Sequence, residues 1–128
     1  MTVRVHVEHI VDARRRIVAC ATALGPLQLI WEADPLPEAG DHDIELDIPS
    51  ILEWGYEIWR AGDEQPPGDV DRPVLTGTLL GFDESGVAEI QVRGGLLLVE
   101  TLGEPPLGAV GDTVELRPPR IHAHPYDL

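Results

Sequence analysis

The sequence contains no lysine and no asparagine, and all nine of its basic residues are arginines. Against these nine stand 23 acidic residues, which give a formal net charge of −14 at pH 7. Because nucleic-acid affinity comes largely from basic side chains that neutralise phosphates, this balance predicts no direct binding to DNA or RNA. The same charge opposes binding to an anionic membrane surface. It favours a basic protein, a cationic ligand or a metal ion as partner.

Cysteine and long apolar runs are also scarce. Cys20 is the only cysteine, so the chain cannot form an intramolecular disulfide. It lies in the apolar run Ile17–Ala21, which predicts a buried, unreactive thiol. The N-terminal residues lack the basic start and apolar core of a signal peptide, and no run approaches the roughly 18 apolar residues of a membrane span. These absences predict a cytoplasmic protein.

The sequence shows no signature of catalysis or of cofactor binding. Ser50 and Ser85 are the only serines, and neither lies in a G-x-S-x-G motif or a glycine-rich phosphate loop. His122 and His124 would lie on one side of an extended segment, but a lone His-x-His is a weak metal signal. The sequence therefore predicts no catalytic residue, no metal site and no cofactor. An enzyme whose carboxylates converge only in three dimensions stays an alternative.

What the sequence does contain is alternation of apolar and polar residues, the pattern of strands with one wet face. It runs through residues 3–8, 27–31, 43–48, 75–82, 87–92, 96–99 and 113–116. Asp83–Gly86 has the composition of a hairpin turn. Ser50–Ala61 is ambiguous, because Ser50 and Glu53 form a capping-box pattern while its apolar residues alternate. Gly55 weakens a helix, and a strand is favoured because Arg120–Tyr126, which matches this segment 70 residues later, is short and contains Pro125.

The chain also resembles itself. Ile44-Glu45-Leu46 recurs 70 residues later as Val114-Glu115-Leu116, and glycines and prolines follow the same spacing with a slip of one residue. We therefore predict repeat 1 over residues 1–61, a linker over 62–73 and repeat 2 over 74–128, packed as one domain. The predicted fold is all-β: an internally duplicated small barrel or sandwich with pseudo-two-fold symmetry. Only its strand rhythm resembles OB- or SH3-like units.

Two sets of residues are candidate binding surfaces. The acidic row, Asp41, Asp43, Glu45 and Asp47, has its carboxylates on one strand face about 6.5–7 Å apart. It is either a solvated face that prevents edge-to-edge association or a docking surface for a basic partner. The aromatic cluster, Trp54, Tyr56 and Trp59, is either core volume or an interface anchor.

The function that the sequence favours is a non-enzymatic cytoplasmic binding protein whose acidic surface engages a basic protein, as an inhibitor or immunity-type protein does. The alternatives are a ligand-binding or accessory module that uses the aromatic cluster, and an enzyme with carboxylate chemistry. A homodimer stays open. The basic triplet Arg14-Arg15-Arg16 could pair with the chain's own carboxylates within the molecule or across such a dimer.

Overall fold

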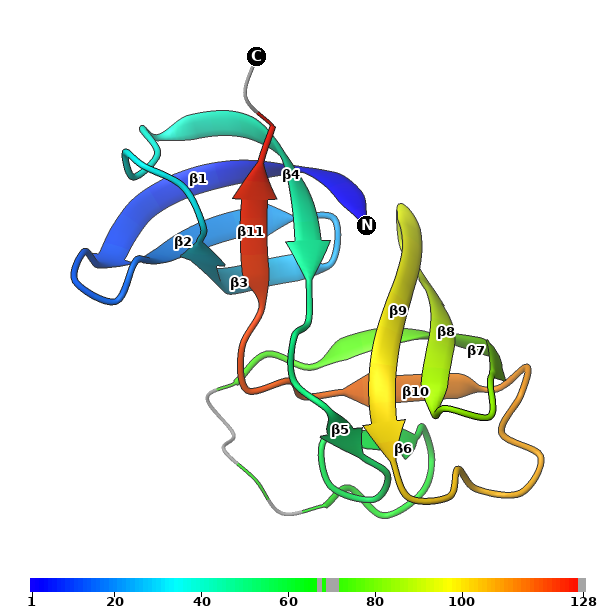
Figure 1. Cartoon of the computed structure of the whole chain (residues 1–128). Coiled ribbons are helices and arrows are strands. Elements are labelled where there is room, and N and C mark those ends of the chain that lie inside the picture. Colours follow the sequence, from blue (N-terminus) through cyan, green and yellow to red (C-terminus); the bar gives the residue numbers. More distant parts are fainter. Residues whose placement is uncertain (67, 69–71, 127–128) are drawn as a thin grey trace. The chain divides into compact units, whose positions relative to one another are not determined.

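The protein is described by a computed structural model that covers residues 1–66, 68 and 72–126, which hold eleven strands and no helix (Figure 1). Within these residues, then, there is no helix of the length and apolarity needed to cross a membrane. The predicted all-β class is confirmed. The predicted linker includes residues 67 and 69–71, which lie outside the described part of the chain.

The strands form two compact units. Unit 1 comprises Met1–Ile48 and Arg120–Leu128, and unit 2 comprises Pro49–Pro119. Unit 1 is a closed barrel of β1 (Thr2–Asp12), β2 (Ile17–Thr22), β3 (Gly25–Trp31), β11 (His122–Pro125) and β4 (Gly40–Asp47), in that order. Unit 2 is a six-stranded sheet in the order β5 (Leu52–Glu53), β9 (Gly95–Leu102), β8 (Val87–Val92), β7 (Leu75–Phe82), β10 (Thr113–Leu116) and β6 (Ile58–Arg60). A bridge between Trp54 and Ile58 links the end of β5 to β6, so this sheet is nearly closed.

In each unit, one strand pairs in parallel with a strand that lies far from it along the chain. In unit 1, β11 follows β10 along the chain, yet it pairs in parallel with β3 through Ala123 and Trp31, and antiparallel with β4. In unit 2, β5 follows β4 along the chain, yet it pairs in parallel with β9 through Leu52 and Thr101. The compact units are therefore not the same segments as the predicted repeats, whose boundaries stay a prediction.

The two units share one strand order. β1, β2, β3 and β4 occupy in unit 1 the places that β7, β8, β9 and β10 occupy in unit 2. Ala19 pairs with Gln28 in unit 1, and Glu89 pairs with Leu98 in unit 2, so this hairpin repeats with the spacing of 70 seen in the sequence.

The strand pairing matches residues of β4 with residues of β10 that lie two positions further along the chain than the sequence alignment placed them. His6 pairs with Ala21 and Asp41, and Thr78 pairs with Gln91 and Thr113. Ile44 therefore corresponds to Leu116, not to Val114. A displacement of two residues leaves every side chain on the same face of its strand, so the predicted burial is unaffected.

The cores follow the alternation of the sequence. Alternation predicts that Ile44, Leu46, Val114 and Leu116 lie in the core, and all four are buried. It also predicts that the acidic residues on the opposite face are exposed; Asp43 and Asp47 are, whereas Glu45 and Glu115 are half-buried. Cys20 is buried too, and this burial raises the pKa of its thiol to about 11 because the thiolate would lose its hydration. The predicted burial of this thiol is confirmed, and its low reactivity stays a prediction.

The hairpin turn before β8 has the predicted chemistry. The Asp83 carboxylate accepts hydrogen bonds from the Ser85 hydroxyl (2.6 Å), the Ser85 backbone N–H (2.9 Å) and the Val87 backbone N–H (3.0 Å). These bonds, the hydroxyl bond first, hold the pKa of Asp83 below its usual range. Gly86 completes the turn with a φ of +89°, which glycine adopts at little cost.

Ser50–Ala61 forms two short strands and no helix. The alternation holds through β5, and then the chain turns at Gly55, whose φ is +91°. The Gly55 N–H donates to the Ile58 carbonyl (2.8 Å), after which β6 begins. In unit 1, the single strand β11 takes the place of both β5 and β6, because Ala123 pairs with Trp31 of β3 and with Leu46 of β4.

Candidate binding surfaces

The acidic row of β4 lies beside β1, and the register of the two strands pairs most of its charges. The Nδ1 atom of His6 lies 2.8 Å from Asp41 Oδ1, and the Nε atom of Arg4 lies 3.1 Å from Asp43 Oδ1. Both are direct cross-strand pairs. Of the four row residues, Asp47 alone has no ion pair within the described part of the chain.

Glu45 has the most partners in the row. The N-terminal ammonium of Met1 pairs with it, Thr2 Oγ1 donates to its Oε2 (3.0 Å), and the Tyr126 hydroxyl donates to the same atom (2.9 Å). The ammonium is the main reason that the pKa of Glu45 lies below its usual range, and the Arg4 guanidinium does the same for the pKa of Asp43. Two of the four carboxylates of the row, Asp43 and Glu45, are thus paired with a cation of the chain itself, which weakens the attraction of the row for an outside cation.

The aromatic cluster does not form one exposed surface. Trp54 and Trp59 are buried, and only Tyr56, at the turn between β5 and β6, is exposed. For the two tryptophans this burial favours the interpretation as packing residues over that as interface anchors.

Trp59 is buried in an unexpected way. Its neighbour Ile58 pairs with Leu116 on the inner face of the unit 2 sheet, whereas Trp59 pairs with Glu115 on the outer face. It is covered there by the Arg117 guanidinium, whose Cζ lies 5.3 Å from the ring centroid. Arg117 is itself buried, so this cation–π contact removes both groups from water. Sequence alternation could not show that an outer residue is covered.

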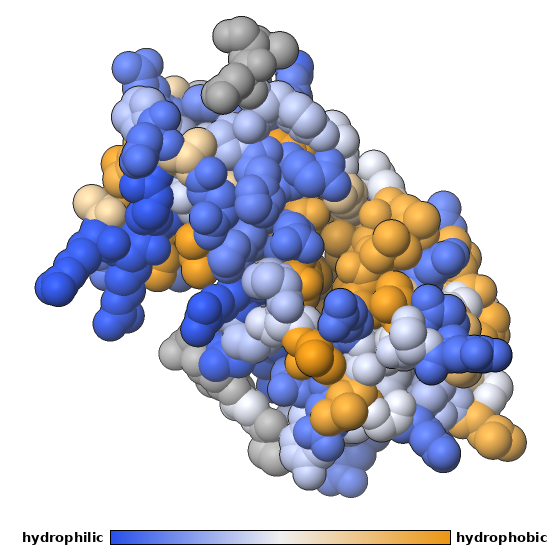
Figure 2. Space-filling model, viewed as in Figure 1, coloured by the Kyte–Doolittle hydropathy of each residue, from blue (hydrophilic) through white to orange (hydrophobic). Residues whose placement is uncertain are grey.

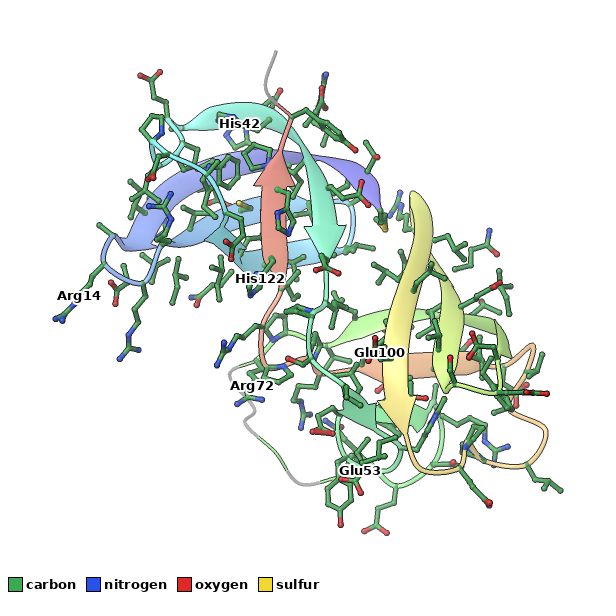
Figure 3. All side chains as sticks on the ribbon, viewed as in Figure 1. Arg14, His42, Glu53, Arg72, Glu100 and His122 are labelled. Atoms are coloured by element: carbon green, nitrogen blue, oxygen red, sulfur yellow. The ribbon has the colours of Figure 1, made fainter. Side chains whose placement is uncertain are left out.

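The histidines offer no metal site. The Nδ1 atom of His122, which is labelled in Figure 3, lies 2.7 Å from Glu32 Oε1, and the centroid of its ring lies 6.4 Å from that of His124. Within the described residues, no group of three or more His, Cys, Asp or Glu side chains could hold a metal ion. His122 and Glu32 form a pair without a third member.

Free carboxylates concentrate in unit 2. Unit 2 has 13 acidic residues and four arginines, against ten acidic residues and five arginines in unit 1, and all five histidines belong to unit 1. Of the eleven described acidic residues of unit 2, only Asp63 and Asp112 form ion pairs, both with Arg60. In unit 1, six of nine described acidic residues pair with a cation or a histidine.

Unit 2 also has exposed apolar side chains on its sheet. Leu96 and Leu98 of β9 are 43% and 58% exposed. Their cross-strand partners on β8 are Gln91 and Glu89, both exposed. In Figure 2, hydrophobic surface gathers over β9 and its neighbour β8. The sequence analysis did not predict this patch. The sequence does contain a signal for it, because Glu100 is the one polar residue on the outer face of β9.

Part of β9 has no strand on one side. The Thr101 N–H donates to Gly86 on the β8 side (2.8 Å), and the Leu102 carbonyl accepts from Trp54 on the β5 side (3.0 Å). Backbone groups alternate in direction along a strand, so those of even-numbered residues point away from β8. β5 covers only Thr101 and Leu102. The open edge of β9, defined as Leu96–Glu100, therefore directs the N–H and C=O groups of Leu96, Leu98 and Glu100 at no other strand among the described residues of unit 2.

A comparison with protein-family models, curated proteins and solved structures found no significant match.

Proposed function

We propose that this chain is a non-enzymatic cytoplasmic binding protein that engages a basic protein, in the manner of an inhibitor or immunity-type protein. Unit 2 makes the contact. The observation that carries the proposal is the set of carboxylates on unit 2 that lack a cationic neighbour in the described structure. Such charges keep their long-range field, whereas the paired carboxylates of the acidic row do not.

The two units are further proposed to derive from one duplicated unit. The shared strand order and the common spacing of 70 in the β2–β3 and β8–β9 hairpins support this origin. After duplication, unit 1 would have kept its charges paired while unit 2 accumulated free ones.

Affinity capture from the native cytoplasm, followed by mass spectrometry, would supply a candidate partner, and the association rate is the measurement that decides. Changing Glu89, Glu100 and Glu104 to glutamine should slow association about tenfold at low salt. The matched control changes Asp43, Glu45 and Asp47 of the acidic row to their amides. It removes the same charge, and its effect should be smaller because two of these groups are already paired.

The salt dependence of the association rate is a second test. Association should slow markedly between low salt and 0.15 M, where charges are screened beyond roughly 8 Å. A captured partner that is acidic, or an association rate that ignores salt and both variants, would overturn the proposed function. Equal slowing by the two variants would overturn the assignment to unit 2.

A further inference from the structure

The open edge of β9 is a place where a chain can add to the sheet. It combines three features: backbone groups of three residues that face no other strand among the described residues of unit 2, two exposed leucines, and free carboxylates at Glu89 and Glu100. Unpaired backbone groups on an apolar edge are a template for another strand, and proteins ordinarily block such edges. Glu100 lies on β9 in Figure 3.

Unit 1 shows what a blocked edge looks like in this same chain. The equivalent strand β3 has Pro26 and Gln28 where β9 has Leu96 and Leu98. Ile30 donates to Ile121 (2.9 Å), so the even-numbered groups of β3 also point away from β2. Pro26 has no N–H to offer at that edge, and proline is a common device against strand addition. Unit 2 has no such device at the matching position.

We propose that the open edge of β9 binds an extended segment of the partner by β-strand addition, and that this segment alternates basic and apolar residues. The inference rests on the proposed function and specifies its contact. Main-chain hydrogen bonds to Leu96, Leu98 and Glu100 hold the segment. On the outer face, arginine stems of the segment lie over Leu96 and Leu98 while their guanidinium groups reach Glu89 and Glu100. Its apolar residues extend the inner face beside Leu97 and Val99.

Charge selects this occupant over a second copy of the chain. Two β9 edges paired antiparallel about Leu98 would bring two strongly acidic units together and would set Glu100 against Leu96. A basic segment meets the same edge with opposite charge.

The test uses the full chain and two synthetic peptides of about six residues, the usual length of a strand. One alternates valine and arginine, and the other has the same composition in two blocks. The alternating peptide should bind at least about tenfold more tightly, and binding should slow hydrogen exchange at the Leu96, Leu98 and Glu100 amides. Equal binding of both peptides would overturn strand addition while leaving a charge-driven function standing. Binding of neither would count against both.

Leu96→Pro is the decisive variant, because it copies the Pro26 of unit 1. The Leu96 N–H points to the open edge, so proline there removes no hydrogen bond of the sheet. L96P should lower the affinity for the alternating peptide to that for the block peptide, with no change in net charge. The matched control Gln28→Pro alters the edge of unit 1 and should leave binding unchanged.

If L96P does not fold, Leu98→Arg with the control Gln28→Arg provides the same comparison through like-charge repulsion. Equal peptide affinity in the edge variant and its control would overturn the proposal. So would protection of the three amides in the free protein that rises with protein concentration, because the edge would then be filled by a second copy.

Discussion

Unit 1 and unit 2 arrange the same order of strands but treat their surfaces differently. In unit 1, Arg4 and His6 of β1 pair with carboxylates of β4, and Pro26 blocks the edge of β3. In unit 2, β7 offers threonines at the matching positions, Thr76 and Thr78, and β9 offers leucines at its edge. The contrast teaches that strand order does not fix the chemistry of a sheet surface. That chemistry depends on which residues the cross-strand register sets side by side.

The largest expected effect concerns the strand of each unit that pairs in parallel with a strand far from it along the chain. Ala123 of β11 and Leu52 of β5 hold equivalent positions, and both are fully buried. An aspartate at either place would bury an unpaired carboxylate, at a cost of more than about 4 kcal/mol. We expect Ala123→Asp to unfold unit 1 and Leu52→Asp to unfold unit 2.

Hydrogen exchange resolved along the sequence checks this pair of variants. A123D should abolish protection in β3 and β4 while β8 and β9 keep theirs, and L52D should give the reverse. Loss of protection in every strand from either change would mean that the two units unfold as one.

The next effect concerns β6 and the turn that precedes it, for which unit 1 has no counterpart besides the single strand β11. Trp59→Ala in β6 should lower the free energy of unfolding by about 3 kcal/mol, because the ring and the Arg117 guanidinium would both lose their packing. The control is Tyr56→Ala in the turn before β6, where the side chain is exposed and the expected change is within about 0.5 kcal/mol. Denaturant unfolding measures both, and equal losses would contradict the burial of Trp59.

A smaller effect is a dependence of stability on pH that comes from a core residue of unit 1 and has no counterpart at the matching position of unit 2. Cys20 in β2 of unit 1 matches Ile90 in β8 of unit 2, so only unit 1 has a titratable group at this core position. The folded thiol has its pKa raised to about 11, and the unfolded thiol ionises near pH 8.5. Between these values the unfolded state releases a proton that the folded state keeps, so stability falls as pH rises.

Wild type should therefore lose on the order of 2 kcal/mol relative to Cys20→Val between about pH 8 and pH 11. Thermal melts of the two proteins across this range measure the difference. Parallel curves would show that the thiol is accessible to water in the folded state, and alkylation of the native protein at neutral pH would show the same.

The sequence by itself determined the strand class, the two faces of most strands and one turn. Alternation is a local property with period two, so Ile44 and Leu116 were placed in the core without knowledge of their partners. The Asp83 turn is likewise closed by neighbours within four residues. Even an alignment displaced by two residues preserved these assignments, since such a shift keeps the face of each side chain.

Only the tertiary structure decided which segments pair. Nothing local in β11 specifies that it lies between β3 and β4, and the pairing of Asp43 with Arg4 joins residues far apart in the chain. The acidic row therefore looked like a free anionic surface in the sequence, and Trp59 looked like either core or anchor. The open edge of β9 became visible for the same reason, because an edge is defined by a missing neighbour, and a neighbour in a sheet is set by long-range register and not by local pattern.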